Sequence, residues 1–339
     1  MICPHCTTNL KRRDRTGGRC GTCKKPFVFE PKANPLALHD VKVRRLTAKL
    51  AEGGLWYTTT QLWYAAARKT NKASTGVTAG CGIVVPIIIG SVMIVVGLTG
   101  GPEPLAVVGV VLLLISATII VLRLAGVFKR EVAVNMPLPQ FRKEIIGGWA
   151  RVYGKPPGGI VDEPHVRPGP PPAQPAFAIL CPDLSVLACL RVNDVERRFA
   201  AALAVNVAEL PAGTPVAVLH DASLDGEVFL ATARHELRGR RVVDLGLRPR
   251  SILAAKDPFK LRTKARQPER IAWLKTQTDL TPKELDWLGD GWSSPVAALR
   301  PAQLLARVEK VAAHLRKAGA PDRDEKAAMA VGFMTWPGQ

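Results

Sequence analysis

Two long runs of apolar residues dominate the hydrophobic pattern of this chain. No charged residue occurs in 73–102 or in 104–122. A helix that crosses a bilayer needs about 20 apolar residues, and each run meets that length. The segment 98–104 between them, LTGGPEP, contains two glycines and two prolines, which predicts a tight turn. One long buried helix is the alternative, but two adjacent runs with a turn between them favour two membrane-spanning helices.

We therefore predict a transmembrane hairpin over 77–128, with spans at about 77–98 and 104–126. Arg68 and Lys69 precede the first run and Lys129 follows the second, whereas the turn carries only a glutamate. The positive-inside rule then places both ends of the chain in the cytoplasm. The expected protein is a two-pass protein of a bacterial inner membrane, with the lipid bilayer as its first partner.

Residues 36–72 form a second predicted unit, which is helical. Its apolar positions fit two helices on either side of Gly53-Gly54, an arrangement that resembles half of a winged helix. A DNA-reading helix needs a polar and basic face, but the second helix shows Leu62, Trp63 and Tyr64. Aromatic residues just before a membrane span also form interfacial belts, so both interpretations stay open.

Two connecting segments follow the hairpin. Residues 129–154 include the amphipathic stretch LPQFRKEIIGGWARVYG, which predicts a helix lying along the membrane interface. Residues 155–175 are rich in proline and poor in apolar residues, which is typical of a semi-rigid extended linker. The linker would hold a C-terminal domain away from the bilayer.

Residues 176–339 alternate strand and helix patterns. Apolar runs at 176–180, 214–219 and 241–247 predict strands, and 185–202 and 226–237 predict helices between them. This order is typical of an α/β fold with a mostly parallel sheet, in which ligands bind beyond the carboxyl ends of the strands. Thr281 and Glu284 form a capping box that opens one helix of a helical tail, and 300–318 is a second amphipathic helix.

The N-terminus carries two C-x-x-C pairs. Cys3 and Cys6 are separated by 13 residues from Cys20 and Cys23. Each pair can form a tight turn that offers two thiolates to a tetrahedral metal. Two disulfides are the alternative, but a reducing cytosol disfavours them. Residues 1–31 resemble a zinc ribbon, which implies one structural zinc held by the four cysteines, with His5 outside the coordination shell.

The segment HDASLDGE, which follows the apolar run 214–219, is similar to the acidic signature of the Toprim fold of topoisomerases and primases. The resemblance covers about 176–250 and implies Mg²⁺ held by acidic residues for phosphodiester chemistry. The catalytic candidates are Asp183, Asp221, Asp225 and Glu227. Ser223 stands where that signature has its second acid, and the glutamate expected after the first strand is replaced by Cys181-Pro182-Asp183. The alternative is that the aspartates cap the following helix and interact with its positive end.

Three further residues could have a chemical role. Cys181, Cys189 and His220 are candidates for a second metal site, and Cys181 is a candidate nucleophile. Single cysteines on apolar elements are more often small buried hydrophobic residues. We expect packing roles for both cysteines.

The net charge is +19, with 47 basic and 28 acidic residues, and it is unevenly distributed. Residues 1–72 alone hold 15 basic and 4 acidic residues. Anionic lipid and nucleic acid both attract such a surface. The candidate contacts are Arg12, Arg13, Lys260, Arg262, Lys264 and Arg266.

These patterns predict a multi-domain membrane protein with a small zinc ribbon, a two-helix hairpin and a C-terminal α/β domain. We expect it to be a membrane-tethered binding or regulatory protein without catalytic activity, whose partner is a protein or a nucleic acid. The alternative is a Toprim-like enzyme that processes nucleic acid with Mg²⁺. The sequence points to no small-molecule substrate.

Overall fold

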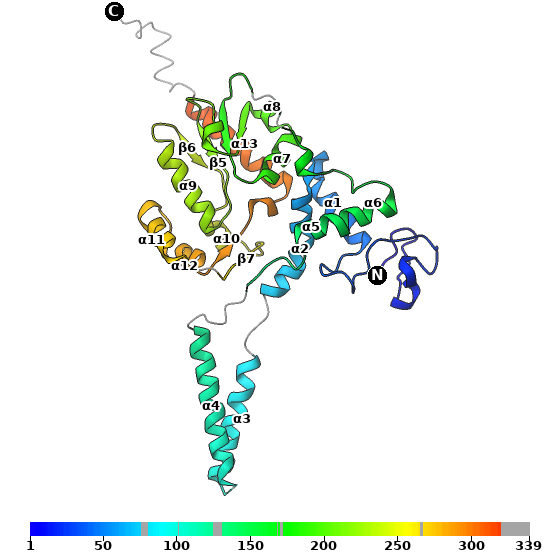
Figure 1. The fold of residues 1–339 in the computed structure, drawn as a ribbon, viewed down its shortest axis with the longest axis vertical. Helices are drawn as coiled ribbons and strands as arrows, with labels where there is room; N and C mark the ends of the chain where they lie inside the picture. The colour runs from blue at the N-terminus through cyan, green and yellow to red at the C-terminus, as the bar shows by residue number, and fades with distance from the viewer. Residues whose placement is uncertain are drawn as a thin grey trace, which may run out of the picture.

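The structure is a computed structural model that describes residues 1–75, 81–100, 102–124, 131–167, 169, 172–264 and 267–319. Figure 1 shows a sheet surrounded by helices, a group of helices beside the N-terminal loops, and a pair of long helices. The described elements therefore fall into an N-terminal ribbon, a helical unit, a helical hairpin and an α/β domain.

The helical unit combines two stretches of the chain that the hairpin separates in sequence. Its elements are α1 (Asp40–Leu50), η2 (Glu52–Gly54), β1 (Tyr57–Thr58), α2 (Thr59–Thr75), α5 (Leu138–Phe141), the π-helical turn η3 (Arg142–Ile146) and α6 (Gly147–Tyr153). Leu36, Leu62, Phe141 and Ile145 are fully buried in one core that the two stretches share. The segment predicted to lie on a membrane interface thus packs its apolar residues against the N-terminal helices.

The proline-rich segment 155–175 also contributes to the fold. It contains β2 (Ile160–Val161), which pairs in parallel with β1 in the register Tyr57↔Ile160, and the turn η4 (Glu163–His165). Glu163 accepts a hydrogen bond from the backbone N–H of Thr60 at 2.7 Å and pairs with Arg142 at 2.7 Å. This segment therefore fastens α2 to η3.

The two apolar runs form the helices α3 (Cys81–Leu98) and α4 (Glu103–Leu124), which lie side by side in Figure 1. Small residues let the backbones approach: a Cβ atom built on Gly109 would lie 2.6 Å from the carbonyl oxygen of Gly90. Large apolar side chains are exposed along both helices, for example Val92 and Leu114. Parts of the predicted spans, 77–80 and 125–126, lie outside the described residues.

Within the part of the chain that the structure describes, no helix has both the length and the apolar character needed to cross a membrane. The predictions of a transmembrane hairpin, of a membrane fold class and of a two-pass inner-membrane location with both termini in the cytoplasm are therefore wrong.

The α/β domain confirms the predicted parallel sheet. Its elements are β3 (Phe177–Leu180), α7 (Leu184–Val192), α8 (Val195–Phe199), β4 (Ala201–Ala204), η5 (Val207–Glu209), β5 (Val216–Val218), α9 (Leu224–Glu236), β6 (Val242–Asp244), α10 (Pro249–Ala254), β7 (Leu261–Arg262), α11 (Pro268–Gln277), α12 (Pro282–Gly289), β8 (Trp292–Ser293), η6 (Val296–Ala298) and α13 (Pro301–Gly319). The strand order is β4-β3-β5-β6, and every neighbouring pair is parallel.

One predicted helix of this domain is partly a strand. The pattern at 185–202 predicts one helix, but the structure has α7 and α8, and β4 then begins at Ala201. Asp194 and Ala200 adopt positive φ values of 63° and 51°, and these left-handed residues break the helical run at both ends of α8. The capping box of α12 is confirmed, because Thr281 and Glu284 exchange hydrogen bonds.

Strand β3 lies between β4 and β5. The chain passes from β3 to β4 on one side and then crosses over to β5 on the other side of β3. The carboxyl ends of β3 and β5 are therefore adjacent at the switch point where α/β folds place their ligands. The helical unit covers part of this region: the hydroxyl groups of Thr58 and Ser185 are 2.9 Å apart, and Gln61 donates to the carbonyl oxygen of Leu299. Asn193 also exchanges hydrogen bonds with the backbone of Trp56.

Candidate metal centre

The four N-terminal cysteines come from two turns with the same geometry. The first turn lies between the bridged residues Ile2 and Asn9, and the second lies between Arg19 and Pro26. In each, the backbone N–H of the residue after the second cysteine donates to the carbonyl oxygen of the first cysteine, at 3.2 Å and 2.9 Å.

A left-handed residue closes each turn. Thr7 and Lys24, the residues directly after the second cysteines, have φ values of 58° and 60°. This conformation reverses the chain within two residues, so both thiols of a pair remain on one side of the turn. The backbone N–H of His5 also points to the sulfur of Cys3 at 3.4 Å, and that of Cys23 points to Cys20 at 3.5 Å.

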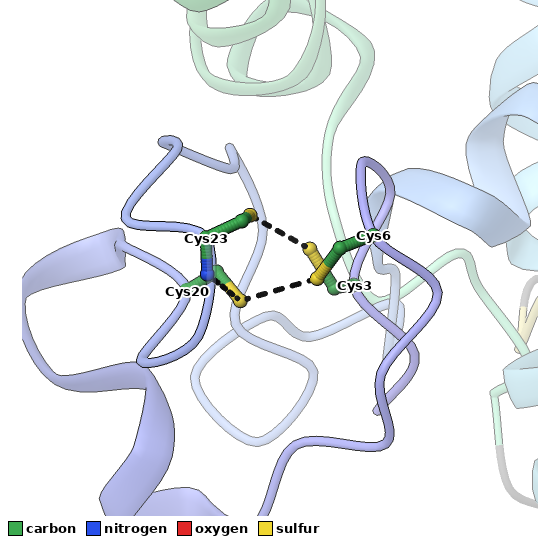
Figure 2. A group of neighbouring side chains, drawn as sticks. All are labelled: Cys3, Cys6, Cys20 and Cys23. Atoms are coloured by element: carbon green, nitrogen blue, oxygen red, sulfur yellow. Dashed lines mark hydrogen bonds between the residues drawn. The ribbon is translucent and has the colours of Figure 1, made fainter.

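The two turns face each other and bring the four sulfurs together (Figure 2). Their ligand atoms all lie within 4.8 Å of one another, with Sγ–Sγ distances of 3.8 Å from Cys3 to Cys23 and 3.7 Å from Cys6 to Cys20. A tetrahedron with metal–sulfur bonds of about 2.3 Å has edges of about 3.8 Å. The four cysteines therefore lie close together, as the two C-x-x-C pairs predict, and could hold a tetrahedral metal ion.

Hydrogen bonds around the cluster lower the pKa of two of its thiols. Hydrogen bonds with Thr8 lower the pKa of Cys6 to about 6, and the backbone N–H of Cys23 lowers the pKa of Cys20. A backbone hydrogen bond from Lys25 lowers the pKa of Cys23, but burial and the neighbouring thiols outweigh it and raise the value to about 11. Four thiols this close compete for negative charge, and a bound dication removes the competition.

His5 lies beside this cluster but points away from it. Its Nε2 atom is 3.0 Å from the carbonyl oxygen of Pro26, and its ring centroid lies 6.1 Å from that of Tyr153. The ligand group contains cysteines alone, so His5 is outside it, as the resemblance to zinc ribbons implies.

A buried aspartate joins the ribbon to the helical unit. Asp40, the first residue of α1, accepts hydrogen bonds from the backbone N–H groups of Val28 at 2.9 Å and Phe29 at 3.0 Å, and from the hydroxyl of Tyr153. Arg44, one turn later, donates to the carbonyl oxygen of Pro4 at 3.2 Å. These contacts connect both sides of the ribbon to α1 and α6, and the sequence pattern did not reveal them.

The carboxylates of the Toprim-like segment occupy different surroundings. Asp183 caps α7 by accepting from the backbone N–H groups of Ser185 and Val186, and Asp221 accepts from the N–H of Val296 at 2.7 Å. Burial raises the pKa of both carboxyl groups, to about 6 for Asp221, and the charge of Asp183 contributes to that shift. These two residues lie at the switch point, as the sequence predicted for strand ends.

The other two carboxylates point elsewhere. Asp225 is exposed and forms an ion pair with Arg270 at 2.6 Å, whereas Glu227 is buried and lies 3.4 Å from Arg248. Ser223, rather than an aspartate, caps α9 by accepting from the N–H of Gly226. Among the described residues, the N-terminal cysteines are the sole group in which three or more potential ligands come together, so the four carboxylates do not form a metal set there.

A buried charged network occupies the ends of β5 and β6. His220 donates from Nε2 to Asp244 at 3.1 Å and from Nδ1 to its neighbour's carbonyl, and Arg248 pairs with Asp244 on its other side. Burial opposes both charges, yet this pairing raises the pKa of His220 and lowers that of Asp244 to about 2. A Cβ atom on Gly246 would overlap the imidazole, so glycine is required there. The sequence could have indicated this network, because polar residues stand at the ends of two strands that were predicted to be parallel.

Cys181 and Cys189 are buried. Burial raises the pKa of both thiols, to about 12 for Cys189, which disfavours the thiolate that a nucleophile or a metal ligand needs. His220 contacts Asp244 rather than either sulfur. The predicted packing role for the two cysteines agrees with this burial.

Several of the basic residues predicted to contact nucleic acid or anionic lipid interact with other residues of the protein. Arg262 is largely buried, pairs with Asp290 at 3.4 Å, and lies 4.9 Å from the ring of Trp292, which Lys260 also approaches. Arg13 approaches Asp14 at 3.7 Å. Two candidates, Arg12 and Lys264, are exposed, and Arg266 lies outside the described residues.

Comparisons with protein-family models, with curated proteins and with solved structures find no match for this chain.

Proposed function

We propose that residues 1–31 bind one Zn²⁺ through Cys3, Cys6, Cys20 and Cys23, and that the protein works by binding a macromolecular partner rather than by catalysis. The observation that carries the proposal is the tetrahedral arrangement of four sulfurs with edges of 3.7 and 3.8 Å. An all-thiolate tetrahedron suits Zn²⁺ or iron. Zinc is favoured because closed four-cysteine sites in small ribbons are its usual structural form.

A structural role follows from the donor set. Four thiolates fill a tetrahedral shell and leave no position at which a water or substrate can bind the metal. The ribbon is small, with only a few buried residues between its two turns, so metal binding supplies much of its folding free energy. Asp40 and Arg44 then hold the folded ribbon against α1 and α6.

The dispersed carboxylates support binding over catalysis. Phosphodiester chemistry with Mg²⁺ needs several carboxylate oxygens around one cation. Here Asp225 pairs with an arginine on the surface, and Glu227 pairs with Arg248 inside the domain. The remaining two, Asp183 and Asp221, each use one oxygen to accept backbone hydrogen bonds.

Elemental analysis of the purified full chain tests the metal. We expect about one zinc per chain and no visible absorption from iron, with loss of the metal in the Cys20→Ser/Cys23→Ser double variant. Cys181→Ser/Cys189→Ser is the matched control, because it removes two buried cysteines outside the cluster and should leave the zinc content unchanged. Full zinc content in the first double variant would refute the assignment.

Nuclease activity tests the alternative. The full chain is incubated with Mg²⁺ or Mn²⁺ and supercoiled DNA, beside Asp221→Ala. We expect no metal-dependent nicking from either protein. Nicking by the wild type that Asp221→Ala abolishes would replace the binding proposal with the Toprim-like enzyme.

A further inference from the structure

The N-terminal 50 residues carry an excess of positive charge that their own carboxylates do not offset. This part of the chain has 12 basic and 3 acidic residues. It contains the ribbon and all of α1, which Asp40 and Arg44 hold together through hydrogen bonds. The charge therefore belongs to one compact body.

Each of the three carboxylates is already engaged inside this body. Asp14 accepts from the backbone N–H of Lys11 at 2.9 Å, and Glu30 pairs with Arg15 at 2.9 Å. Asp40 is fully buried and accepts its hydrogen bonds from Val28, Phe29 and Tyr153. Since these groups face inward or toward near neighbours, they leave the outer cations without a local counter-charge.

Six exposed basic side chains make up the set that we call the ribbon surface. None of the six has an ion-pair partner among the residues that the structure describes. They are Lys11, Arg12, Lys24, Lys25, Arg45 and Lys49. Arg45 and Lys49 are four residues apart and so lie on one side of α1. Lys11 and Arg12 follow the first cysteine turn, and Lys24 and Lys25 lie in the second.

Cations also crowd one another near α1. Burial lowers the pKa of His39, and the charges of Lys42, the N-terminal amine and Arg45 lower it further, against the opposing charge of Asp40. The pKa of Lys42 is also lowered, by burial and then by Lys69 of α2. Of these cations, Arg45 belongs to the ribbon surface, so an anion bound beside it would relieve part of the repulsion at His39.

The composition of the surface indicates what kind of anion binds. Protein-protein contacts depend on apolar and aromatic anchors. Within residues 1–50, Ile2 is the only large hydrophobic side chain that the structure shows as exposed, and Phe27 and Phe29 are buried. Single strands bind to exposed aromatic rings on which bases stack. Residues 1–50 contain no tyrosine or tryptophan and both phenylalanines are buried, so the exposed imidazole of His5 is the one ring there that a base could reach. Unpaired cations with so few apolar anchors and stacking rings suit the phosphates of a duplex.

We propose that the ribbon surface binds the phosphate backbone of double-stranded nucleic acid without reading its sequence. This inference rests on the proposed function as a binding protein and names its partner. The affinity comes from release of counterions as phosphates are neutralised, so it depends steeply on salt. The zinc acts indirectly, by folding the two turns that position Lys11, Arg12, Lys24 and Lys25.

Fluorescence anisotropy with the zinc-loaded full chain and a labelled 20-base-pair duplex tests this proposal. With about six phosphate contacts, the affinity should fall about 10³-fold between 50 and 200 mM salt. The fourfold variant Lys11→Gln/Arg12→Gln/Arg45→Gln/Lys49→Gln should lose at least about 100-fold in affinity at 100 mM salt. It keeps all four cysteines, so its zinc content should equal that of the wild type.

The matched control neutralises four exposed cations of the α/β domain: Arg234→Gln/Lys275→Gln/Lys283→Gln/Lys310→Gln. It removes the same net charge and should change the affinity less than about threefold. Equal losses in the two variants would overturn the ribbon surface as the binding site. Preference for a single strand, or binding of polyglutamate but not of the duplex, would overturn the duplex as the partner. Any of these results, obtained with zinc content equal to that of the wild type, would not affect the assignment of zinc to the four cysteines.

Discussion

The ribbon and the carboxyl edge of the sheet each present four candidate ligand residues, but only the ribbon brings its four together. The cysteine sulfurs lie within 4.8 Å of one another. At the sheet edge, Asp183 and Asp221 lie near the switch point, while Asp225 is on the surface and Glu227 is inside the domain. A motif predicts a site well where local backbone geometry fixes its side chains.

The two groups differ in how far apart in the sequence the residues lie that fix the positions of their side chains. Each cysteine pair is closed by a left-handed residue directly after it, so the residues of the motif determine the turn. Asp225 and Glu227 are two positions apart on α9, and successive helical residues are rotated by about 100°, so their side chains leave opposite sides of the helix. An ion pair with Arg270 holds the side chain of Asp225, and an ion pair with Arg248 holds that of Glu227.

Removal of the metal should give the largest effect and should affect one region alone. Zinc sites in small ribbons contribute about 10–16 kcal/mol, so a chelator should unfold residues 1–31. Hydrogen exchange measured with and without chelator should show loss of protection there and unchanged protection in β3, β5 and β6. Loss of protection in the sheet as well would mean that the two regions are not independent.

The second largest effect is expected for Asp40→Ala, which separates the ribbon from α1. Two backbone N–H groups and a phenol lose their acceptor, each at about 1–3 kcal/mol, so local stability should fall by about 3 kcal/mol or more. Native-state hydrogen exchange at Val28 and Phe29 measures this change. Asp286→Asn, at an exposed site on α12, is the control and should stay within about 0.5 kcal/mol of the wild type.

Asp221→Asn should stabilise the α/β domain. A carboxyl group whose pKa rises on folding, here from 3.8 to about 6, adds no penalty below pH 3.8 and its full penalty above pH 6. The variant keeps the oxygen that accepts from Val296, so the free energy of unfolding should rise by about 1–3 kcal/mol at pH 7. Urea unfolding at pH 7 and pH 3.5 tests this. The gain should vanish at the lower pH, and destabilisation at pH 7 would indicate that the ionised carboxylate is needed.

Asp225→Asn should give the smallest effect. Its ion pair with Arg270 is exposed, and such pairs contribute about 0–1 kcal/mol. The same unfolding measurement in 0.05 and 0.5 M salt should show a difference from the wild type that shrinks with salt. A large, salt-independent loss would give Asp225 a structural role that its exposure does not suggest.

Much of the fold was predictable because it depends on short stretches. The apolar runs predicted β3, β5 and β6, and their alternation with helices predicted a parallel sheet. The apolar runs predicted helices at about 77–98 and 104–126, and α3 and α4 lie within those bounds apart from Glu103, but the membrane placement inferred from them was wrong. Strand β4 was missed because Ala201 to Ala204 continue a helical pattern, and the left-handed Ala200 that ends the helix has no recognisable signal.

The sequence by itself determined the cysteine cluster, since the equal spacing of the two cysteine pairs specifies two turns of the same geometry. Tertiary structure alone decided how the ribbon is anchored, because the bond between Tyr153 and Asp40 joins residues 113 positions apart. It also decided that His220, Asp244 and Arg248 form a network, because the pairing of β5 with β6 places their ends side by side. Local turns follow from neighbouring residues, whereas buried charges find their partners only when distant elements pack.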